Sequence, residues 1–478
     1  MNQEDKKTSG LYLLLFLVLG VLLRLLSFSD SLIDHDESTY AVIANNLLQG
    51  KHFFADVWDT KPIGIFLVFA GIIKIAGQSV EALRLAAALA IGLTAWFLYR
   101  TGRKLGKSNS LSMFSGLAYI LMCSVHQWNF AANTEIFFNL TTVAGLWILL
   151  SKPENKGYLL GGLVLGMGFL IKHFVLADVL AIWIALLFIL PAGEKGKWST
   201  RIIPLTLWMG LGFSLPFLLN ATWFFYQGLW QDFFFANFVL PRNYVSEARP
   251  GKALQYFSEF HLIYFPLVLM LLAAIFRGKD RPLAHFAALW YGLVWLMILL
   301  PGKYFHHYYF QLLPVLSLGV LAFPGSAPQI EAFLQKYRRM FFPASMALFI
   351  AWNTLLQYRQ FTLRPDYPRE MASFLKDRME ETDRLYCNGA MVIHFLLDEP
   401  VLHKYIHPTL LSKKEHREAA GIDRDLVFQS VVGQKPDWLV IEGNPSRLIR
   451  EYIDNECVLR QRFGAQYRVY ERKERKEL

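Results

Sequence analysis

Long apolar runs dominate the first 356 residues of this 478-residue chain and constrain its fold more than any other feature. Hydrophobic residues make up 54% of the sequence and charged residues only 18%, with a mean hydropathy of +0.31. This apolar share exceeds that of an ordinary soluble domain, and about 20 apolar residues suffice for a helix to cross a bilayer. We therefore predict an all-α polytopic membrane protein with about eleven transmembrane helices, near residues 11–29, 80–100, 110–130, 135–150, 158–171, 174–190, 202–220, 259–276, 283–300, 304–323 and 340–356.

The short segment 62–77 decides the topology. It is apolar, but it begins with Pro62 and contains Lys74, so it could cross the bilayer or lie in the interface. Positive residues concentrate in cytoplasmic loops, and the chain has five basic tufts between its apolar runs. All five fall inside only if the amino terminus is cytoplasmic and 62–77 does not cross. We therefore expect segment 62–77 to form a juxtamembrane helix on the outer face. The five basic tufts are residues 100–107, 152–156, 194–201, 277–281 and 336–339.

This topology gathers the polar clusters of the chain on the outer face. The net charge of +10 is spread over those tufts, so it reports topology rather than nucleic-acid binding. The first apolar run is long and no small-residue cleavage site follows it, so we interpret it as a retained span and not as a signal peptide. We expect one outer site, built from residues 30–61, 131–135, 172–173, 221–258 and 301–307.

The stretch "DHDESTYAVIANNLLQG" (34–50) predicts an amphipathic helix along the outer surface, with Tyr40 on the same face as Asp36. Acidic residues are favoured in the first turn by the helix dipole, and Asp34 is adequately explained as a helix cap. Two more acids, Asp36 and Glu37, exceed what capping needs. We assign both as candidate catalytic carboxylates.

Lys61 follows Asp59 and comes directly before Pro62. A lysine at this depth usually extends to lipid headgroups without specificity, but it can also hold the phosphate of a lipid-linked substrate. Two more lysines, Lys172 and Lys303, stand at outer helix ends, where the positive-inside rule disfavours them. The three lysines together favour a phosphate-binding site, with Asp59 in a supporting role.

Glu135 begins a predicted span on the same outer face, where capping and function explain an acid equally well. His173 adjoins Lys172, and His306 and His307 are adjacent. Neighbouring histidines of a helix point to different faces and no third ligand is suitably spaced, so we expect supporting roles for these three histidines and no metal site.

Two further regions differ from the apolar runs. The aromatic loop 221–258 predicts an interfacial helix covering the site, with Arg242 and Arg249 as candidate anion contacts. From 357 to 478 the chain is charged and mixed, and it predicts a small α/β domain outside the membrane, after a transmembrane domain at 1–356. Within this tail we expect short strands at "DRLYCNG" and "DWLVIEG", a helix at "SRLIREYIDN" and a last strand at "QYRVYERK". Cys387 and Cys457 lie in this tail, and both a disulfide and free thiols remain open.

The order of several blocks resembles the GT-C glycosyltransferases related to protein O-mannosyltransferases and lipid A aminoarabinose transferases. "DESTYAVIANNLLQG" is followed by "DTKP", and "NTEIF", "GMGFLIKH" and "GKYFHHYYFQLLP" come later in the family's order. The resemblance covers roughly residues 10–325. It implies inverting transfer of a sugar from a polyprenyl-phosphate donor to an acceptor on the outer side of the membrane.

The resemblance also implies roles for individual residues. Asp36 matches the family's essential carboxylate, which acts as a base or orients the acceptor. Lys61 matches the lysine near the lipid phosphate, Glu135 the second acid, and Lys172 and Lys303 the lysines at helix ends. Sugar transfer from phosphate needs such a carboxylate, together with cations that stabilise the charge on the departing phosphate.

The chain departs from some relatives at Thr60 and Thr39, where those relatives carry an acid and an arginine. These departures argue against a divalent metal and against aminoarabinose as the sugar, and we expect no cofactor. The expected partners are the polyprenyl-phosphate donor, a lipid, glycan or protein acceptor, and the bilayer, without nucleic acid. We expect the inner (plasma) membrane as location. The alternative function is a transporter or flippase of a lipid-linked saccharide, because charges facing a bundle interior also line transport pathways.

Overall fold

The computed structural model divides the chain into two compact units, which are described separately. It describes residues 3–126, 128, 130–190, 198–243, 245, 249–323 and 328–473, so part of the predicted tuft at 194–201 and of the predicted aromatic loop at 221–258 lies outside the described residues. The first unit consists of residues 1–27, 84–223 and 245–360. The second consists of residues 28–83, 224–244 and 361–478.

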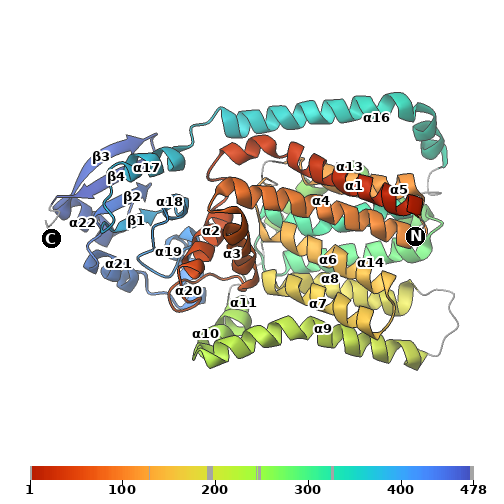
Figure 1. The fold of residues 1–478 in the computed structure, drawn as a ribbon, viewed down its shortest axis with the longest axis horizontal. Coiled ribbons are helices and arrows are strands. Elements are labelled where there is room, and N and C mark those ends of the chain that lie inside the picture. The colour runs from red at the N-terminus through yellow and green to blue at the C-terminus, as the bar shows by residue number, and fades with distance from the viewer. Residues whose placement is uncertain are drawn as a thin grey trace. The chain divides into compact units, whose positions relative to one another are not determined.

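In its described residues the first unit contains helices joined by loops and has no β-strand (Figure 1). Its elements are α1 (Gln3–Leu22), α4 (Val80–Lys104), α5 (Asn109–Met122), α6 (Thr134–Ser151), α7 (Asn155–Ile171), α8 (Val175–Ile184), η3 (Ala185–Ile189), α9 (Trp198–Tyr226), α12 (Pro250–Ile263), α13 (Phe265–Arg277), α14 (Arg281–Leu299), η5 (His306–Leu312), α15 (Leu313–Ala322) and α16 (Pro328–Gln357), and η1 (Leu25–Ser29) and η6 (Tyr358–Thr362) lie at the unit boundaries.

Glycines on α7 let two neighbouring helices approach closely. A Cβ added at Gly161 would lie 2.5 Å from Leu149 of α6, and one added at Gly162 or Gly166 would lie 2.2 or 2.3 Å from backbone oxygens of α9. Small residues four positions apart are typical of helix contacts in membranes, where close backbone approach replaces the hydrophobic effect as the source of attraction. The sequence "GYLLGGLVLG" thus fixes α7 between α6 and α9.

Fewer helices qualify as full membrane spans than the eleven expected. Among the described residues, four are long and apolar enough by length and composition, namely α4, α6, residues 202–226 of α9, and α14. Helix α7 has 17 residues, which reach about 25 Å against a hydrocarbon core of about 30 Å. Other apolar helices are also shorter than 18 residues, and α3 (Gly64–Ala76) is one of them, in keeping with the predicted juxtamembrane segment.

Three predicted spans are interrupted. The run at 259–276 breaks at Tyr264, where α12 and α13 meet at 91°. Pro266 explains the break, because proline lacks an amide hydrogen and disfavours a helical residue before it. The run at 304–323 begins as the 3₁₀ helix η5, so α15 has only 10 residues. Helix α5 ends at Met122, well before residue 130.

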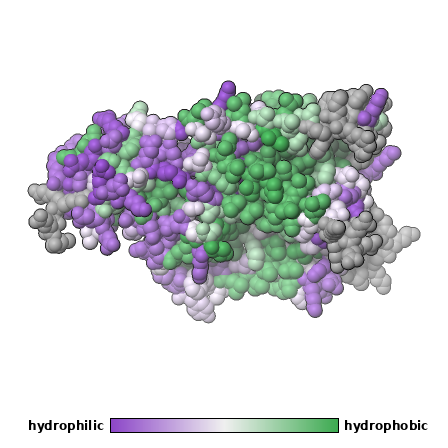
Figure 2. Space-filling view, turned by 45° about the horizontal axis from the view of Figure 1, so that its top comes forward, coloured by the Kyte–Doolittle hydropathy of each residue, from purple (hydrophilic) through white to green (hydrophobic). Residues whose placement is uncertain are grey.

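The helices of the first unit carry a broad apolar surface. Figure 2 shows hydrophobic residues covering much of the visible helical face. Exposed large hydrophobic side chains follow α9, among them Ile203, Leu207 and Leu219, each with more than half of its surface accessible. A continuous apolar surface of this size marks a membrane-facing region, because soluble monomers rarely expose one.

The second unit combines three distant stretches of chain. Its helices are α2 (His35–Leu48), α3, α10 (Trp230–Phe234), η4 (Phe235–Val239), α11 (Leu240–Asn243), α17 (Tyr367–Lys376), α18 (Val392–Leu397), α19 (Pro408–Ser412), α20 (Lys414–Ala420), α21 (Arg424–Gly433) and α22 (Arg447–Glu456). The predicted helix at 34–50 is confirmed, but the expectation that it is amphipathic and lies along a surface is wrong. Every residue of α2 from Asp36 to Asn46 is buried, because α3 and α18 pack against it.

The tail forms a four-stranded mixed sheet in the order β1-β2-β4-β3. β1 (Leu385–Asn388) and β2 (Trp438–Glu442) are parallel, whereas β4 (Tyr467–Arg472) pairs antiparallel with β2 and with β3 (Cys457–Phe463). The two strands expected at "DRLYCNG" and "DWLVIEG", the helix at "SRLIREYIDN" and the last strand are confirmed; β3 was not predicted. Cys387 and Cys457 carry free, buried thiols.

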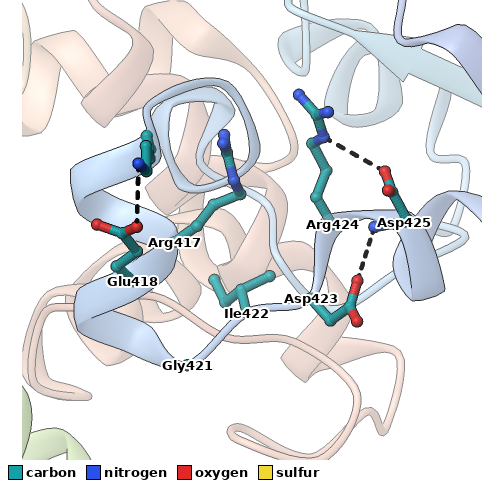
Figure 3. Close-up of a pocket in the computed structure, with 8 residues that line it drawn as sticks. Arg417, Glu418, Gly421, Ile422, Asp423, Arg424 and Asp425 are labelled. Atoms are coloured by element: carbon teal, nitrogen blue, oxygen red, sulfur yellow. Dashed lines mark hydrogen bonds and ion pairs between the residues drawn. The ribbon is translucent and has the colours of Figure 1, made fainter.

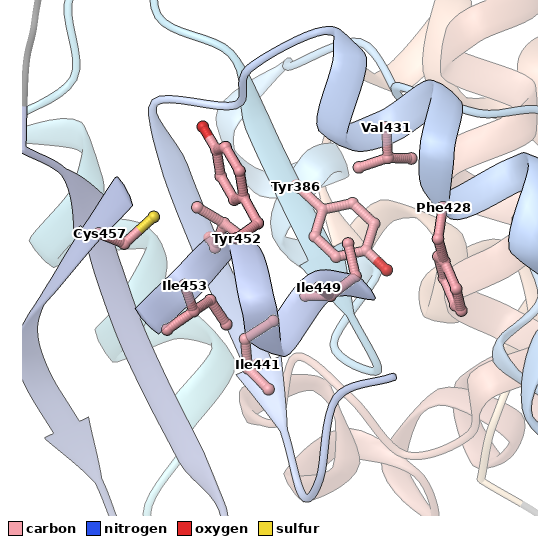
Figure 4. Packing of buried hydrophobic residues seen from close by; sticks show 9 residues of the cluster. Tyr386, Phe428, Val431, Ile441, Ile449, Tyr452, Ile453 and Cys457 are labelled. Atoms are coloured by element: carbon pink, nitrogen blue, oxygen red, sulfur yellow. The ribbon is translucent and has the colours of Figure 1, made fainter. Parts of the chain in front are cut away.

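The core of the tail lies between this sheet and helices α21 and α22 (Figure 4). Helix α22 alternates apolar and charged residues at helical spacing, so Ile449, Tyr452 and Ile453 turn inward together. They meet side chains of β1, β2 and α21, and the buried cluster comprises Tyr386, Phe428, Val431, Leu439, Ile441, Ile449, Tyr452, Ile453 and Cys457.

Two histidines of the tail predict a pH-dependent stability. Burial lowers the pKa of His394 and of His403 to about 4, and in His403 the neighbouring His394 adds to the effect. Both rings stay neutral when folded but bind protons below about pH 6.5 when unfolded. We expect the free energy of unfolding of the tail to fall as the pH drops from 6.5 towards 4, by at most about 3 kcal/mol per histidine.

Hydrogen exchange of β1 and β2 in the full-length protein, corrected for intrinsic rates, measures this loss. A variant with His394→Gln and His403→Gln should lose much less protection over the same pH interval. An equal loss in both proteins would contradict the assignment.

Candidate functional site

Asp36 lies at the first turn of α2, where the helix begins with a side-chain cap. Asp34 precedes the helix, and its Oδ1 accepts a hydrogen bond from the Asp36 amide at 3.0 Å. The predicted capping role of Asp34 is thereby confirmed. Asp36 itself is buried in the second helical position, where the amino-terminal end of the helix dipole stabilises a negative charge. Glu37 is buried in the same turn but points in a different direction around the helix axis.

Lys61 reaches the Asp36 carboxylate from the loop before α3. Its Nζ lies 2.8 Å from Asp36 Oδ1 and 3.6 Å from Asp59 Oδ1. Asp59 also accepts hydrogen bonds from the Lys61 amide at 3.1 Å and from the Thr60 hydroxyl at 3.2 Å. The buried Asp59 therefore holds the loop in the conformation that presents Lys61 to Asp36.

The aromatic ring of Tyr40 completes the surroundings of the ammonium. Lys61 Nζ lies 5.2 Å from the centre of this ring, within the range of a cation–π contact. Tyr40 is four residues after Asp36, so both side chains share one face of α2. Phe66 and Phe69 of α3 contact the same ring edge-to-face and fix its orientation.

The charge on Lys61 is strongly favoured by this environment. Burial by itself would lower the pKa of the ammonium, but the carboxylates of Asp36 and Asp59 outweigh burial. The pKa of Lys61 therefore lies well above its usual value. Lys61 remains cationic at every physiological pH, as an anion-binding group requires.

A histidine that the sequence did not suggest also contacts Asp36. His407 Nε2 lies 3.0 Å from Asp36 Oδ1. The two residues are separated by most of the chain, and neither spacing nor periodicity relates them. The only local signal is "HPT" at 407–409, which is typical of a helix start and carries no hint of chemistry.

A second acid–lysine pair occurs in the first unit. Lys172 donates to Glu135 Oε1, while the Thr134 hydroxyl donates to Glu135 Oε2 at 2.9 Å. Lys172 also lies 4.1 Å from the ring centre of Tyr308. Glu135 and Lys172 are both buried. The two residues thus form a direct ion pair, which exceeds what capping of α6 requires, and their roles in the reaction stay predictions.

The remaining predicted residues of the first unit have separate environments. His306 Nε2 lies 3.1 Å from Glu259 Oε1, and its ring stacks on Trp128 at 5.2 Å. His307 stacks on Phe305 at 5.6 Å, and His173 contacts Phe169 at 4.7 Å. Lys303 is buried in the turn before η5.

Two residues predicted as anion contacts are exposed. Arg242 ends α11 in the second unit, and Arg249 precedes α12 in the first. The structure confirms helices over much of 221–258, although as several short pieces in place of one interfacial helix. Roles for both arginines remain predictions.

A shallow groove of charged residues between α20 and α21 is a rival candidate (Figure 3). Its charges are occupied structurally: Lys414 pairs with Glu418 at 3.6 Å, and Asp423 caps α21. Arg417 donates to the Leu411 carbonyl at 2.8 Å. The groove therefore lacks the buried acid and cation that reaction chemistry requires, and Asp36 is the better candidate.

Comparison with known proteins supports the resemblance found in the sequence. Residues 60–223 match the family described as dolichyl-phosphate-mannose-protein mannosyltransferase. An undecaprenyl phosphate-alpha-4-amino-4-deoxy-L-arabinose arabinosyl transferase of Pseudomonas fluorescens is 30% identical over 201 residues, which cover 39% of this chain and 35% of that protein. A lipopolysaccharide core galacturonosyltransferase of Rhizobium johnstonii is 25% identical over 305 residues, covering 61% and 57%. The chain thus matches less than two thirds of the length of these relatives.

Solved structures extend the likeness of fold to nearly the whole chain. The ArnT protein of Cupriavidus metallidurans, solved bound to undecaprenyl phosphate, has a TM-score of 0.70 at 14% identity, with 96% of this chain and 97% of that chain covered. The archaeal oligosaccharyltransferase of Archaeoglobus fulgidus has a TM-score of 0.52 at 9% identity, covering 92% and 70%. The chain therefore has the polytopic membrane fold of these proteins, with a small carboxy-terminal mixed sheet.

The Glu135–Lys172 pair predicts a specific stability pattern. Glu135→Gln removes the carboxylate opposite a buried ammonium and should lower the free energy of unfolding by about 3 kcal/mol or more. Replacing both residues, with Glu135→Leu and Lys172→Met, should recover most of this loss because no buried charge then remains. Thermal unfolding of the purified protein in detergent measures both effects. A double variant no more stable than Glu135→Gln would contradict the direct pairing.

Proposed function

We propose, from the premise that this chain shares its fold and its 60–223 segment with the polyprenyl-phosphate-dependent GT-C glycosyltransferases, that it is an integral membrane glycosyltransferase. In this proposal it moves a sugar from a polyprenyl-phosphate donor to an acceptor on the outer face of the membrane, with inversion. The observation that carries the proposal is the contact of 2.8 Å between the buried Asp36 carboxylate and the Lys61 ammonium.

Asp36 serves the acceptor in the proposed reaction. A hydroxyl becomes a competent nucleophile when a carboxylate takes or orients its proton. Asp36 is held at a helix start by the Asp34 cap, so its position is fixed before substrate arrives. The acceptor oxygen attacks the anomeric carbon, the bond from that carbon to the phosphate oxygen breaks, and the acceptor proton passes to Asp36.

Lys61 serves the donor. The departing lipid phosphate gains negative charge as the sugar leaves, and a fixed cation in a water-poor site stabilises that charge strongly. Lys61 pairs with Asp36 in the structure, so a donor phosphate that attracts the ammonium weakens its hold on the carboxylate. Donor binding thereby makes Asp36 a better base. Lys172, Lys303 and Arg242 remain predicted as further phosphate contacts, and Glu135 as a second acid.

The relatives above are named for different sugars, an aminoarabinose in one case and a galacturonic acid in the other. Thr60 stands where some relatives carry an acid, and its hydroxyl binds Asp59. The proposed step uses the side chains of Asp36 and Lys61 and needs no metal ion. We propose an inner-membrane location with the tail outside.

Asp36→Asn tests the proposed base. The amide keeps the shape of the side chain but accepts no proton, so we expect transfer to fall at least about 100-fold while the protein inserts and purifies normally. Asp34→Asn is the matched control, because asparagine also caps helices well and should leave transfer near the wild-type rate. The measurement is formation of glycosylated product from undecaprenyl-phosphate sugars by the protein in vesicles. Lipid movement across the bilayer without bond formation would favour a flippase instead.

Lys61→Gln tests the donor contact. Loss of a charged hydrogen-bond donor should weaken equilibrium binding of undecaprenyl phosphate roughly 10- to 100-fold. Since the pKa of Lys61 lies above its usual value, wild-type affinity should stay constant between pH 7 and about pH 10. Lys51→Gln is the control, because Lys51 is an exposed lysine in the turn after α2. Equal binding by all three proteins would remove Lys61 from the donor site.

A further inference from the structure

We propose that His407, contributed by the carboxy-terminal part of the chain, is a positioning residue for the Asp36 carboxylate. This inference rests on the proposed function, in which Asp36 engages the acceptor hydroxyl. It assigns the tail a direct part in the reaction centre, which the resemblance to known families did not cover. The inference is drawn from the local geometry around a single carboxylate oxygen.

Two donors converge on Asp36 Oδ1. Lys61 Nζ lies 2.8 Å from this atom and His407 Nε2 lies 3.0 Å from it. The side chains of Asp36, Lys61 and His407 are 11%, 15% and 14% exposed, so the three groups meet largely away from water. Hydrogen bonds to a charged acceptor are strongest under such conditions.

The other nitrogen of the ring determines which proton His407 carries. Its Nδ1 accepts a hydrogen bond from the Thr409 amide at 3.2 Å and lies 2.8 Å from the Thr409 hydroxyl. A backbone amide can only donate, so this pattern assigns the proton to Nε2. The Nε2–H group therefore points at Asp36 as a donor. His416 Nδ1 lies 3.0 Å from the same hydroxyl and helps to fix the position of the Thr409 side chain.

The chain segments that carry the two donors run side by side. Trp58 donates its amide to the Lys404 carbonyl at 2.7 Å, and Trp58 and Tyr405 form a parallel bridge. Their rings also meet edge-to-face at 5.7 Å. Lys61 comes three residues after Trp58, and His407 comes two residues after Tyr405. The bridge therefore places Lys61 and His407 close to the same oxygen, Asp36 Oδ1.

Convergence on one oxygen has a consequence for the other. With Oδ1 held by an ammonium and an imidazole, the plane of the carboxylate is fixed. Both of these contacts are to Oδ1, and we assign the other oxygen, Oδ2, to the acceptor hydroxyl. A reacting group that is held in place raises the rate because no orientation is lost on reaction. We expect the loss of His407 to loosen the orientation of the Asp36 carboxylate, because one of the two donors to Oδ1 is then missing.

The test compares His407→Leu with His407→Gln in the full-length protein in nanodiscs. Glutamine places an amide N–H near the position of Nε2, whereas leucine fills the space without a donor. We expect leucine to lower the turnover number of transfer roughly 10- to 100-fold, with affinity for undecaprenyl phosphate unchanged within about two-fold. Glutamine should restore most of the rate. His403→Gln, at a half-buried tail histidine that is not a partner of Asp36 in the described contacts, is the control and should retain the rate.

A second measurement needs no catalysis. Thermal unfolding of wild type, Asp36→Ala, His407→Leu and the double variant gives a mutant cycle, and contact between the two side chains requires non-additive midpoints. Additive midpoints, or a His407→Leu variant with the wild-type rate, overturn the inference. If the midpoints are non-additive but the wild type transfers no sugar, the pairing stands and the proposed function fails.

Discussion

The pairing of Asp36 with Lys61 is the interaction on which the arrangement of the second unit depends. An ammonium and a carboxylate removed from water are costly unless each finds the other together with further hydrogen bonds. Here the Asp34 cap, Asp59 and the ring of Tyr40 supply those contacts. The loop before α3 can take only a conformation that satisfies all of them, so the position of α3 against α2 follows from the charges as well as from the apolar contacts.

Each of the two units contains a buried acid at a helix start that is paired with a lysine. Asp36 is the second residue of α2, and Glu135 is the second residue of α6. Each acid meets a lysine that stands outside a regular helix, Lys61 before α3 and Lys172 directly after α7. A helix start is a favourable place for a buried anion, because unpaired amides and the dipole both stabilise it. Each acid is thus held by a helix start on one side and by a lysine on the other.

Much of the second unit could be anticipated from local patterns. The cap at Asp34, a helix through "DESTYAVIANNLL" and three of the four strands of the tail follow from spacing and turn residues. Membrane spans were less predictable, because hydropathy does not register the interruption at Pro266 or the 3₁₀ start of η5. β3 was missed since most of its residues are exposed and polar, leaving little periodicity. His407 could not have been paired with Asp36 by any local rule, because only the fold brings them together.

The bridge between Trp58 and Tyr405 also bears on how the protein is made. Ribosomes add about 5 to 20 residues per second, so roughly 20 to 75 seconds separate the synthesis of Asp36 from that of His407. During this interval most helices of the first unit have already emerged, while one side of the carboxylate still lacks its neighbour. A nascent chain stalled before the tail therefore lacks both the bridge and the imidazole that contacts Asp36.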